Sequence, residues 1–178
     1  QWMEVKKSID WQQRKSSLVK LLDEVRSGDE RYDCIVPVSG GKDGSYIAFH
    51  LKHVYGMNPL CVTVSPPLSL TLGEKNLKSF IDCGYSHLTI NPSTEIMRKI
   101  DKFGFVNIGF PYYGWLTAIT TVPLCIAAKF GISLVCYAED GEIEYGGSTK
   151  SQSSYIKSLE YAKNILLSGR HDDAIRAV

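Results

Sequence analysis

The sequence lacks several features that would decide the class of the protein at once. None of its five cysteines forms a C-x-x-C pair, so neither a zinc knuckle nor a thioredoxin-type redox site is indicated. No apolar run approaches the roughly 18 residues that a membrane span requires, and no signal peptide is visible. Neither sign of charge is in excess, because the chain has 20 lysines and arginines and 19 acidic residues. We therefore expect a cytoplasmic protein with reduced thiols and with neither nucleic acid nor membrane as a partner.

Apolar runs and helical patterns alternate along the 178 residues, which are enough for one domain with a hydrophobic core. Strands are predicted at 34–38, 60–64, 87–90 and 132–138. Helices are predicted at 9–27, from the turn after the first strand to about 55, and at 74–83, 93–103, 113–130 and 155–168. Pro123 should kink or split the helix that contains it.

This alternation predicts an α/β fold, a parallel sheet with helices on both faces. Ligands of such sheets bind at the carboxyl ends of the strands. Those ends are the loops at 39–45, 65–73, 91–93 and 139–148. A further loop rich in Gly, Phe and Tyr is predicted at 104–112.

The turn 39–45, with the sequence SGGKDGS, is the segment that most constrains function. An apolar strand that ends at a Gly-rich turn and continues as a helix presents backbone N–H groups to an anion, most often phosphate. The turn is not the common P-loop, because the spacing G-x-x-x-x-G-K-[ST] is absent. The alternative is a plain strand-to-helix connection with a Ser or Asp cap.

The turn offers several kinds of group to a phosphate. Two glycines let the backbone approach closely, two hydroxyls can donate hydrogen bonds, and one ammonium adds positive charge. These groups belong to Gly40, Gly41, Ser39, Ser45 and Lys42.

The two other residues of the turn are Asp43 and Gly44. A carboxylate repels phosphate, so Asp43 is predicted to cap the following helix or to bind Mg²⁺. Gly44 stands where the pyrophosphate loop (PP-loop) of the ATP-pyrophosphatase superfamily, S-G-G-x-D-S, has its last Ser. The turn otherwise resembles that loop. Members of the superfamily split ATP between the α and β phosphates and adenylate their substrate.

Two more blocks make the resemblance narrower. The stretches 109–116 (GFPYYGWL) and 137–148 (YAEDGEIEYGGS), together with 39–46, resemble the bacterial N-acetyl sugar amidotransferases. This family makes acetamidino sugars for lipopolysaccharide O-antigens and for flagellar glycans of the pseudaminic and legionaminic type, and it also resembles this chain in having Gly at position 44. The similarity covers about residues 30–150 and implies an adenine-nucleotide alpha-hydrolase-like (HUP/PP-loop) three-layer sandwich.

The resemblance implies a reaction in two steps. The N-acetyl oxygen of a nucleotide-linked sugar attacks the α-phosphorus of ATP, which gives an O-adenylated imidate and pyrophosphate. Ammonia from a glutaminase subunit then displaces AMP and leaves an amidine. Catalysis would be positioning and charge stabilisation, with ATP and Mg²⁺ as cofactors and no covalent enzyme nucleophile.

The resemblance also implies roles for particular residues. The whole turn 39–45 would bind ATP, with the adenine near the backbone of Thr63, Val64 and Ser65. The catalytic candidates are Lys42, Asp43, Glu139 and Asp140, of which Asp43 is also the metal candidate. The substrate candidates are Tyr112, Tyr113, Trp115, Glu142, Gly146 and Gly147.

Each of these sets of candidate residues also has a simpler structural interpretation. The carboxylates after 138 could form a solvated acidic turn, and the aromatic residues could be a hydrophobic plug at a helix start. Gly146 and Gly147 could only form a turn. The four histidines show no partner spacing and are expected to be structural or on the surface.

The chain departs from the family at both ends. Family members carry a cysteine-pair segment before the loop and continue well past the second Gly-containing loop, whereas no cysteine precedes Cys34 here. We expect a helical segment at 1–29, a PP-loop domain at 30–150 and an incomplete helical tail at 151–178, from a chain that is a fragment or a shortened member. The sequence also leaves open whether the chain forms a homodimer. The alternatives are another PP-loop enzyme, of the tRNA-thiolating or NAD-synthetase-like kind, and a nucleotide-binding module without catalysis.

Overall fold

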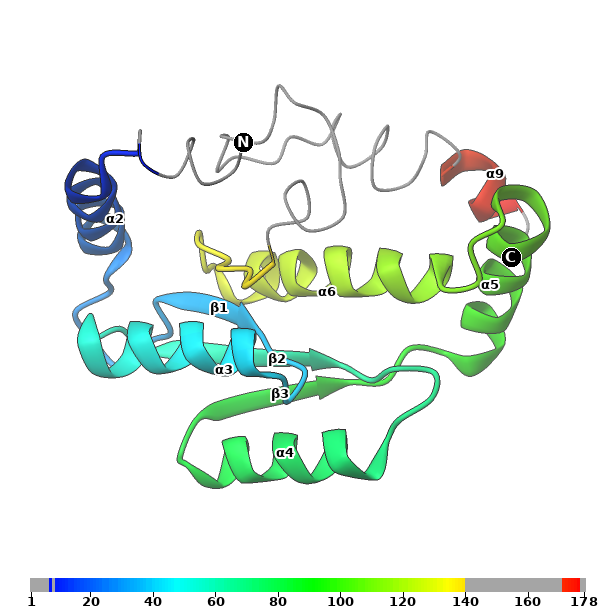
Figure 1. Cartoon of the computed structure of the whole chain (residues 1–178), viewed down its shortest axis with the longest axis horizontal. Coiled ribbons are helices and arrows are strands. Elements are labelled where there is room, and N and C mark those ends of the chain that lie inside the picture. Colours follow the sequence, from blue (N-terminus) through cyan, green and yellow to red (C-terminus); the bar gives the residue numbers. More distant parts are fainter. Residues whose placement is uncertain (1–6, 8, 140–170, 177–178) are drawn as a thin grey trace.

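The computed structural model describes residues 7, 9–139 and 171–176. Three strands, β1 (Cys34–Pro37), β2 (Pro59–Val64) and β3 (Ser86–Ile90), form a parallel sheet in the order β1-β2-β3 (Figure 1). The register sets Ile35 opposite Leu60, and Leu60 opposite Ser86. The predicted α/β class and the first three predicted strands are confirmed.

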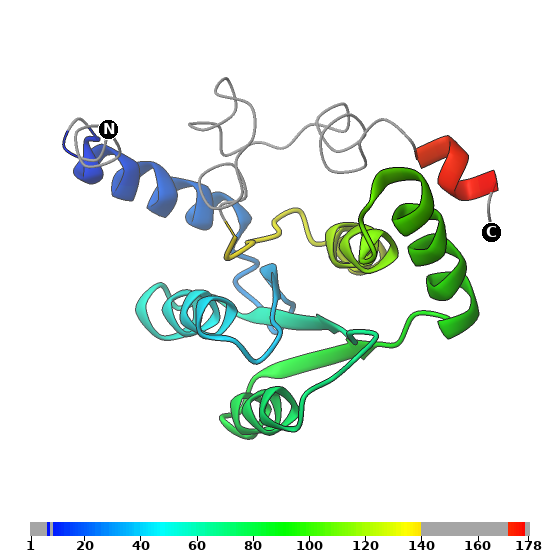
Figure 2. The same cartoon turned by 45° about the vertical axis from the view of Figure 1, so that its right-hand side comes forward.

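Helices lie on both faces of this sheet, as predicted. Figure 2 shows α3 (Lys42–Phe49) and α4 (Thr71–Asp82) on one side of the strands and α6 (Tyr113–Phe130) on the other. The other helices among the described residues are α2 (Trp11–Val25), the π-helix η1 (His50–Val54), α5 (Thr94–Ile108) and α9 (His171–Arg176). Within the described part of the chain, no helix is both long enough and apolar enough to cross a membrane.

Alternate residues of the strands bury their side chains in two separate cores, because successive side chains of a strand point to opposite faces. Cys34, Val36 and Cys61 pack with residues of α2, α3 and α4. Ile35 and Val62 pack against α6 and its C-terminal neighbours. Strands β1 and β2 are therefore buried on both faces, which explains their largely apolar sequence, whereas β3 is partly exposed.

The fourth predicted strand, 132–138, makes a single bridge to the described residues, between Val135 and Ile35. The amide of Ile35 donates to the carbonyl oxygen of Leu134 at 2.9 Å, and the amide of Cys136 donates to that of Ile35 at 2.8 Å. The chain thus returns parallel to β1, on the side away from β2. The direction of strand addition reverses between β1 and this segment, and such a switch point is where open α/β sheets bind ligands.

Helix α5 ends at Ile108, so the loop predicted at 104–112 is wrong over its first half. Gly104 lies inside the helix because its backbone packs closely on the next one: a Cβ there would stand 2.4 Å from the Cβ of Tyr113. Gly109, with φ +76°, ends the helix as a left-handed C-cap. Sequence pattern alone treats Gly as a breaker, whereas here it allows two helices to touch.

Pro123 does not split α6, which continues for 18 residues through it. The proline is buried, and the hydroxyl of Tyr137 donates to the carbonyl oxygen of Thr120 at 2.8 Å in the turn before it. The helix predicted at 9–27 is confirmed as α2, capped by Asp10, but only Leu22 of its predicted apolar face is buried. The helix predicted at 155–168 lies outside the described residues.

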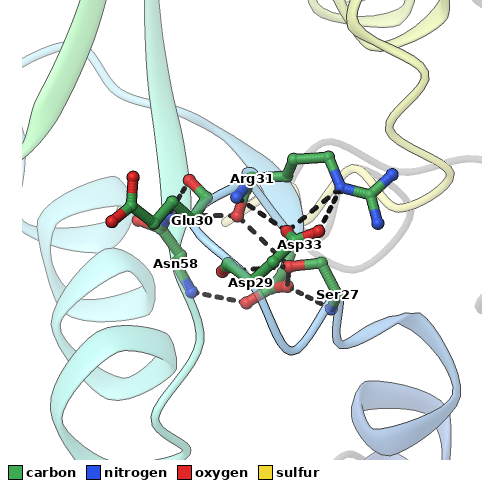
Figure 3. Close-up of polar contacts among 6 residues, drawn as sticks. All are labelled: Ser27, Asp29, Glu30, Arg31, Asp33 and Asn58. Atoms are coloured by element: carbon green, nitrogen blue, oxygen red, sulfur yellow. Dashed lines mark hydrogen bonds and ion pairs between the residues drawn. The ribbon is translucent and has the colours of Figure 1, made fainter.

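The amino ends of β1 and β2, opposite the switch-point edge, are joined through one buried carboxylate. Asp33 accepts hydrogen bonds from the amide and hydroxyl of Ser27, at 2.6 and 2.8 Å, and from the amide of Asn58 at 2.7 Å (Figure 3). The side-chain amide of Asn58 in turn donates to the carbonyl oxygens of Glu30 and Arg31. This network fixes the end of the sheet that lies away from the candidate site.

Candidate functional site

The turn 39–45 begins where β1 leaves the sheet. The amide of Val38 still donates to the carbonyl oxygen of Val62 at 2.9 Å, as in a strand. The carbonyl oxygen of Val38 instead accepts from the hydroxyl of Thr63, at 2.6 Å. Gly40 then turns the chain with φ +81°, and α3 starts after Gly41.

Within the part of the chain that the structure describes, no side chain caps the start of α3. The first N–H groups of a helix have no acceptor within the helix, and the helix dipole gives them a partial positive charge. Because this helix start lies at the carboxyl end of β1, beside the switch point, the backbone arrangement expected of a phosphate-binding turn is present.

Gly40 is required by close packing as well as by its φ angle. A Cβ at this position would lie 2.8 Å from the amide nitrogen of Leu77 and 2.9 Å from the carbonyl oxygen of Gly73. The turn therefore rests directly on the backbone of the first turns of α4, which supports the turn from behind.

Gly44 is also held at close range, on the other side of the turn. A Cβ there would lie 2.9 Å from the carbonyl oxygen of Pro37 and 3.2 Å from the Cα of Val38. The first turn of α3 thus sits on the end of β1, and any side chain at position 44 would push the helix away. This contact gives a physical reason why the chain has Gly where the superfamily pattern has Ser.

The charged and hydroxyl side chains of the turn interact among themselves. The ammonium of Lys42 lies 2.6 Å from Oδ1 and 2.8 Å from Oδ2 of Asp43, and the two side chains are 87% and 52% exposed. The hydroxyl of Ser45 donates to the carbonyl oxygen of Gly41 at 2.8 Å. Ser39 is exposed at the start of the turn. Lys42 and Asp43 are thus accessible to a ligand, and an anion would compete for the ammonium.

The predicted adenine-side residues lie at the same edge, at the end of β2. Thr63 is buried, and its hydroxyl contacts both Val38 and Nε2 of His87, the latter at 2.7 Å. Its side chain is therefore occupied within the sheet, and only its backbone could serve a base. The hydroxyl of Ser65 donates to Oδ1 of Asn91, and its amide donates to the carbonyl oxygen of Ile90.

His87 and Asn91 were not among the residues that the sequence assigned to the site. Both stand on or next to β3 and reach the end of β2 from there. Burial lowers the pKa of His87 below its usual value, which keeps the imidazole neutral near pH 7. Asn91 belongs to the strand-end loop 91–93, so the strand-end rule could have identified it, whereas nothing in the sequence pattern links His87 to Thr63.

The three aromatic substrate candidates lie at the start of α6, next to α5 (Figure 1). Tyr112 is 50% exposed, while Tyr113 is 2% exposed and packs against Phe103, with ring centroids 6.2 Å apart. Trp115 is half-buried, and its Nε1 is a buried donor that has no hydrogen-bond partner within the described residues. Of the three, Tyr112 presents the most surface to a ligand.

The acidic candidates fall at the limit of the described residues. Glu139 is exposed, at the end of the segment that returns beside β1. Asp140, Glu142, Gly146 and Gly147 lie outside the described residues. Among residues 9–139 and 171–176, no three His, Cys, Asp or Glu side chains gather as a metal site would require. A lone exposed carboxylate such as Asp43 still fits Mg²⁺, which usually takes one or two carboxylates together with substrate phosphates.

Comparison with known proteins adds a distant likeness in fold. No family model matches the chain, and no curated protein matches it. Among solved structures, it is similar to a protein from Methanocaldococcus jannaschii described as a predicted subunit of a tRNA methyltransferase. The two are 23% identical with a TM-score of 0.46, and the match covers 67% of this chain and 58% of the other. The chain thus spans less than two thirds of that protein's length.

Proposed function

We propose that this chain binds ATP at the turn 39–45 and is the ATP-dependent component of an amidotransferase that acts on a nucleotide-linked N-acetyl sugar. The observation that carries the nucleotide part is the uncapped start of α3 behind the Gly40 turn, at the sheet's switch point. The amidotransferase part depends on the three sequence blocks at 39–46, 109–116 and 137–148.

Each accessible group of the turn has a role in the proposal. The amides at the start of α3 hold phosphate oxygens. The Lys42 ammonium gives up its ion pair with Asp43 and neutralises part of the charge of the triphosphate. Asp43 would hold Mg²⁺ together with the phosphates, and the ion would supply charge neutralisation for the leaving pyrophosphate. Glu139 ends the segment on the other side of the switch point, where a carboxylate could accept a proton from attacking ammonia, and Asp140 is the second candidate for this role.

The overall reaction balances without a covalent intermediate on the enzyme. The amide oxygen forms a bond to the α-phosphorus while the bond to pyrophosphate breaks. Ammonia then adds to the imidate carbon, AMP leaves with the former amide oxygen, and one proton is lost. A glutaminase subunit would supply the ammonia, and a homodimer is compatible with the proposal.

The first experiment tests nucleotide binding by calorimetry and thermal melting with ATP and Mg²⁺. ATP should raise the melting temperature of the intact chain, and Lys42→Ala or Asp43→Ala should remove most of the shift. Lys78→Ala and Asp82→Ala are matched controls, because they break an exposed ion pair of 3.4 Å on α4 and should leave the shift unchanged. If ATP produces no shift in the intact chain, the proposal fails.

The second experiment separates the amidotransferase from its rivals. UDP-N-acetyl sugar, ATP, Mg²⁺ and ammonium are incubated with the chain, and the products are analysed by mass spectrometry. AMP, pyrophosphate and a basic sugar product are expected. AMP formed only when tRNA replaces the sugar would indicate another PP-loop enzyme, and ATP binding without AMP would indicate a nucleotide-binding module.

A further inference from the structure

A chain of hydrogen bonds crosses all three strands just below the turn 39–45. It runs from Nε2 of His87 on β3 to the hydroxyl of Thr63 on β2, at 2.7 Å, and from that hydroxyl to the carbonyl oxygen of Val38, at 2.6 Å. Val38 is the last residue before the turn. The chain therefore links the far strand of the described sheet to the point where β1 ends.

Counting protons fixes the direction of these bonds. A threonine hydroxyl has one proton, and a carbonyl oxygen can only accept. If both bonds are made, Thr63 gives its proton to Val38, and its oxygen accepts from His87. Nε2 of His87 must then carry a proton. In the other tautomer, a bare Nε2 would draw the Thr63 proton away, and the Val38 carbonyl would lose this donor.

The tautomer of His87 therefore affects the backbone that forms the turn. The Val38 amide is held by β2 through Val62, so the Thr63 hydroxyl decides whether the carbonyl of the same residue is also held. Ser39 and Gly40 follow Val38, and Gly40 packs so closely on α4 that a Cβ would not fit there. A carbonyl that is free to rotate would loosen the turn at the point where it leaves the sheet.

We infer that His87 is a positioning residue, whose Nε2–H keeps the Thr63 hydroxyl on the Val38 carbonyl and so holds the turn 39–45 in its phosphate-binding shape. The effect of His87 on ligand affinity rests on the proposed ATP binding, whereas its effect on the shape of the turn does not. Burial of the imidazole supports the inference, because a neutral ring has only one N–H and the tautomer then matters.

The first test measures ATP affinity by calorimetry in the full chain. Thr63→Val keeps the shape but removes the hydroxyl, and His87→Phe removes the ring N–H. Thr63→Val should weaken binding about five- to tenfold, because it leaves the buried Val38 carbonyl without its side-chain partner. His87→Phe should weaken binding less, because the Thr63 hydroxyl can still donate to Val38 but is no longer oriented by an N–H. Thr63→Ser and His87→Gln restore a hydroxyl or an N–H donor and should recover most of the loss. Thr89→Val is the matched control, because Thr89 is the exposed register partner of Thr63 on β3.

The second test needs no nucleotide. Nitrogen NMR of the folded chain should show the proton of His87 on Nε2, and His87→Phe should shift the amide resonances of Ser39, Gly40 and Gly41, while Thr89→Val should not. A bare Nε2, or turn resonances that stay in place in His87→Phe, would overturn the inference. If the intact chain fails to bind ATP, the proposed function falls, and the NMR result alone still decides whether His87 positions the turn.

Discussion

Asp33 and Asn58 hold each other at two points across the amino ends of β1 and β2. The amide of Asp33 donates to the carbonyl oxygen of Asn58 at 2.9 Å, and the amide of Asn58 donates to Oδ2 of Asp33 at 2.7 Å. The other carboxylate oxygen, Oδ1, accepts hydrogen bonds from the amide and hydroxyl of Ser27. One buried side chain therefore ties together the segment after α2, the start of β1 and the start of β2 (Figure 3).

Replacing this carboxylate should destabilise the whole domain. Asp33→Asn keeps one acceptor oxygen but points an NH₂ group at a backbone N–H, so at least one buried donor is left without a partner. We expect a loss of about 2–3 kcal/mol in the free energy of unfolding, measured with urea. Asp82→Asn, which breaks only an exposed ion pair on α4, should cost less than about 0.5 kcal/mol. Equal losses in the two variants would contradict the structural role of Asp33.

The same carboxylate should make stability depend on pH. Burial alone would raise the pKa of Asp33, but the hydrogen bonds from Ser27 and Asn58 outweigh it and hold the pKa below its usual value of 3.8. A lowered pKa in the folded state contributes stability that is complete above pH 3.8 and is lost as the pH falls through the folded pKa.

The measurement is the difference in unfolding free energy between the intact chain and Asp33→Asn. This difference should be constant from about pH 7 to about pH 5 and should shrink toward about pH 2, because only the intact chain loses the contribution of the ionised carboxylate. Subtracting the variant removes the effect of the other carboxyl groups. A difference that grows in acid would mean that the folded pKa of Asp33 is raised instead.

Gly44→Ala tests the contact between α3 and the end of β1. The new Cβ would meet the carbonyl oxygen of Pro37 at 2.9 Å, so the helix start must move, and overpacking of this kind costs about 1–3 kcal/mol. Gly73→Ala is the matched control, since it lies in the first turn of α4 with nothing within 4 Å of its Cβ. The control should be neutral or more stable by up to about 1 kcal/mol. A Gly44→Ala chain that is as stable as the unchanged one would show that the first turn of α3 yields easily.

The predictable parts of this fold are those that depend on local pattern. The strand at Cys34 and the turn at Gly40 follow from an apolar run that meets a Gly-rich segment, and the α/β class follows from the alternation of such runs with helical patterns. The predicted helix ends before Gly84 and Gly131, which both take a positive φ, agree with the structure within a few residues, whereas α5 continues past its predicted end to Gly109.

The parts that could not be predicted depend on contacts between distant residues. Asn58 is 25 residues from the Asp33 carboxylate, and His87 is 24 residues from Thr63. Neither pair has a spacing that a helix or strand period would reveal. Gly104 was assigned to a loop because its reason for being Gly, the packing of Tyr113 against α5, exists only once two helices meet.

The half-buried Tyr137 should stabilise the return of the chain beside β1. Its hydroxyl donates to the carbonyl oxygen of Thr120 in α6, and burial raises its pKa to about 12, so it stays protonated at ordinary pH. Tyr137→Phe removes only this oxygen and should cost about 1 kcal/mol. Tyr112→Phe, an exposed tyrosine in the same half of the chain, is the control and should be neutral.

The position of Gly40 separates two causes of glycine preference, backbone conformation and lack of space. Gly84 has nearly the same φ, +85° against +81°, but its Cβ would meet nothing within 4 Å. Gly84→Ala should therefore cost only the strain of a left-handed residue, about 1–2 kcal/mol. Gly40→Ala should cost about 1–3 kcal/mol more, because its Cβ would also press on the backbone of α4 at Leu77. Denaturant unfolding of both variants gives the comparison. Equal costs would mean that α4 gives way, and that the turn is not supported by that helix.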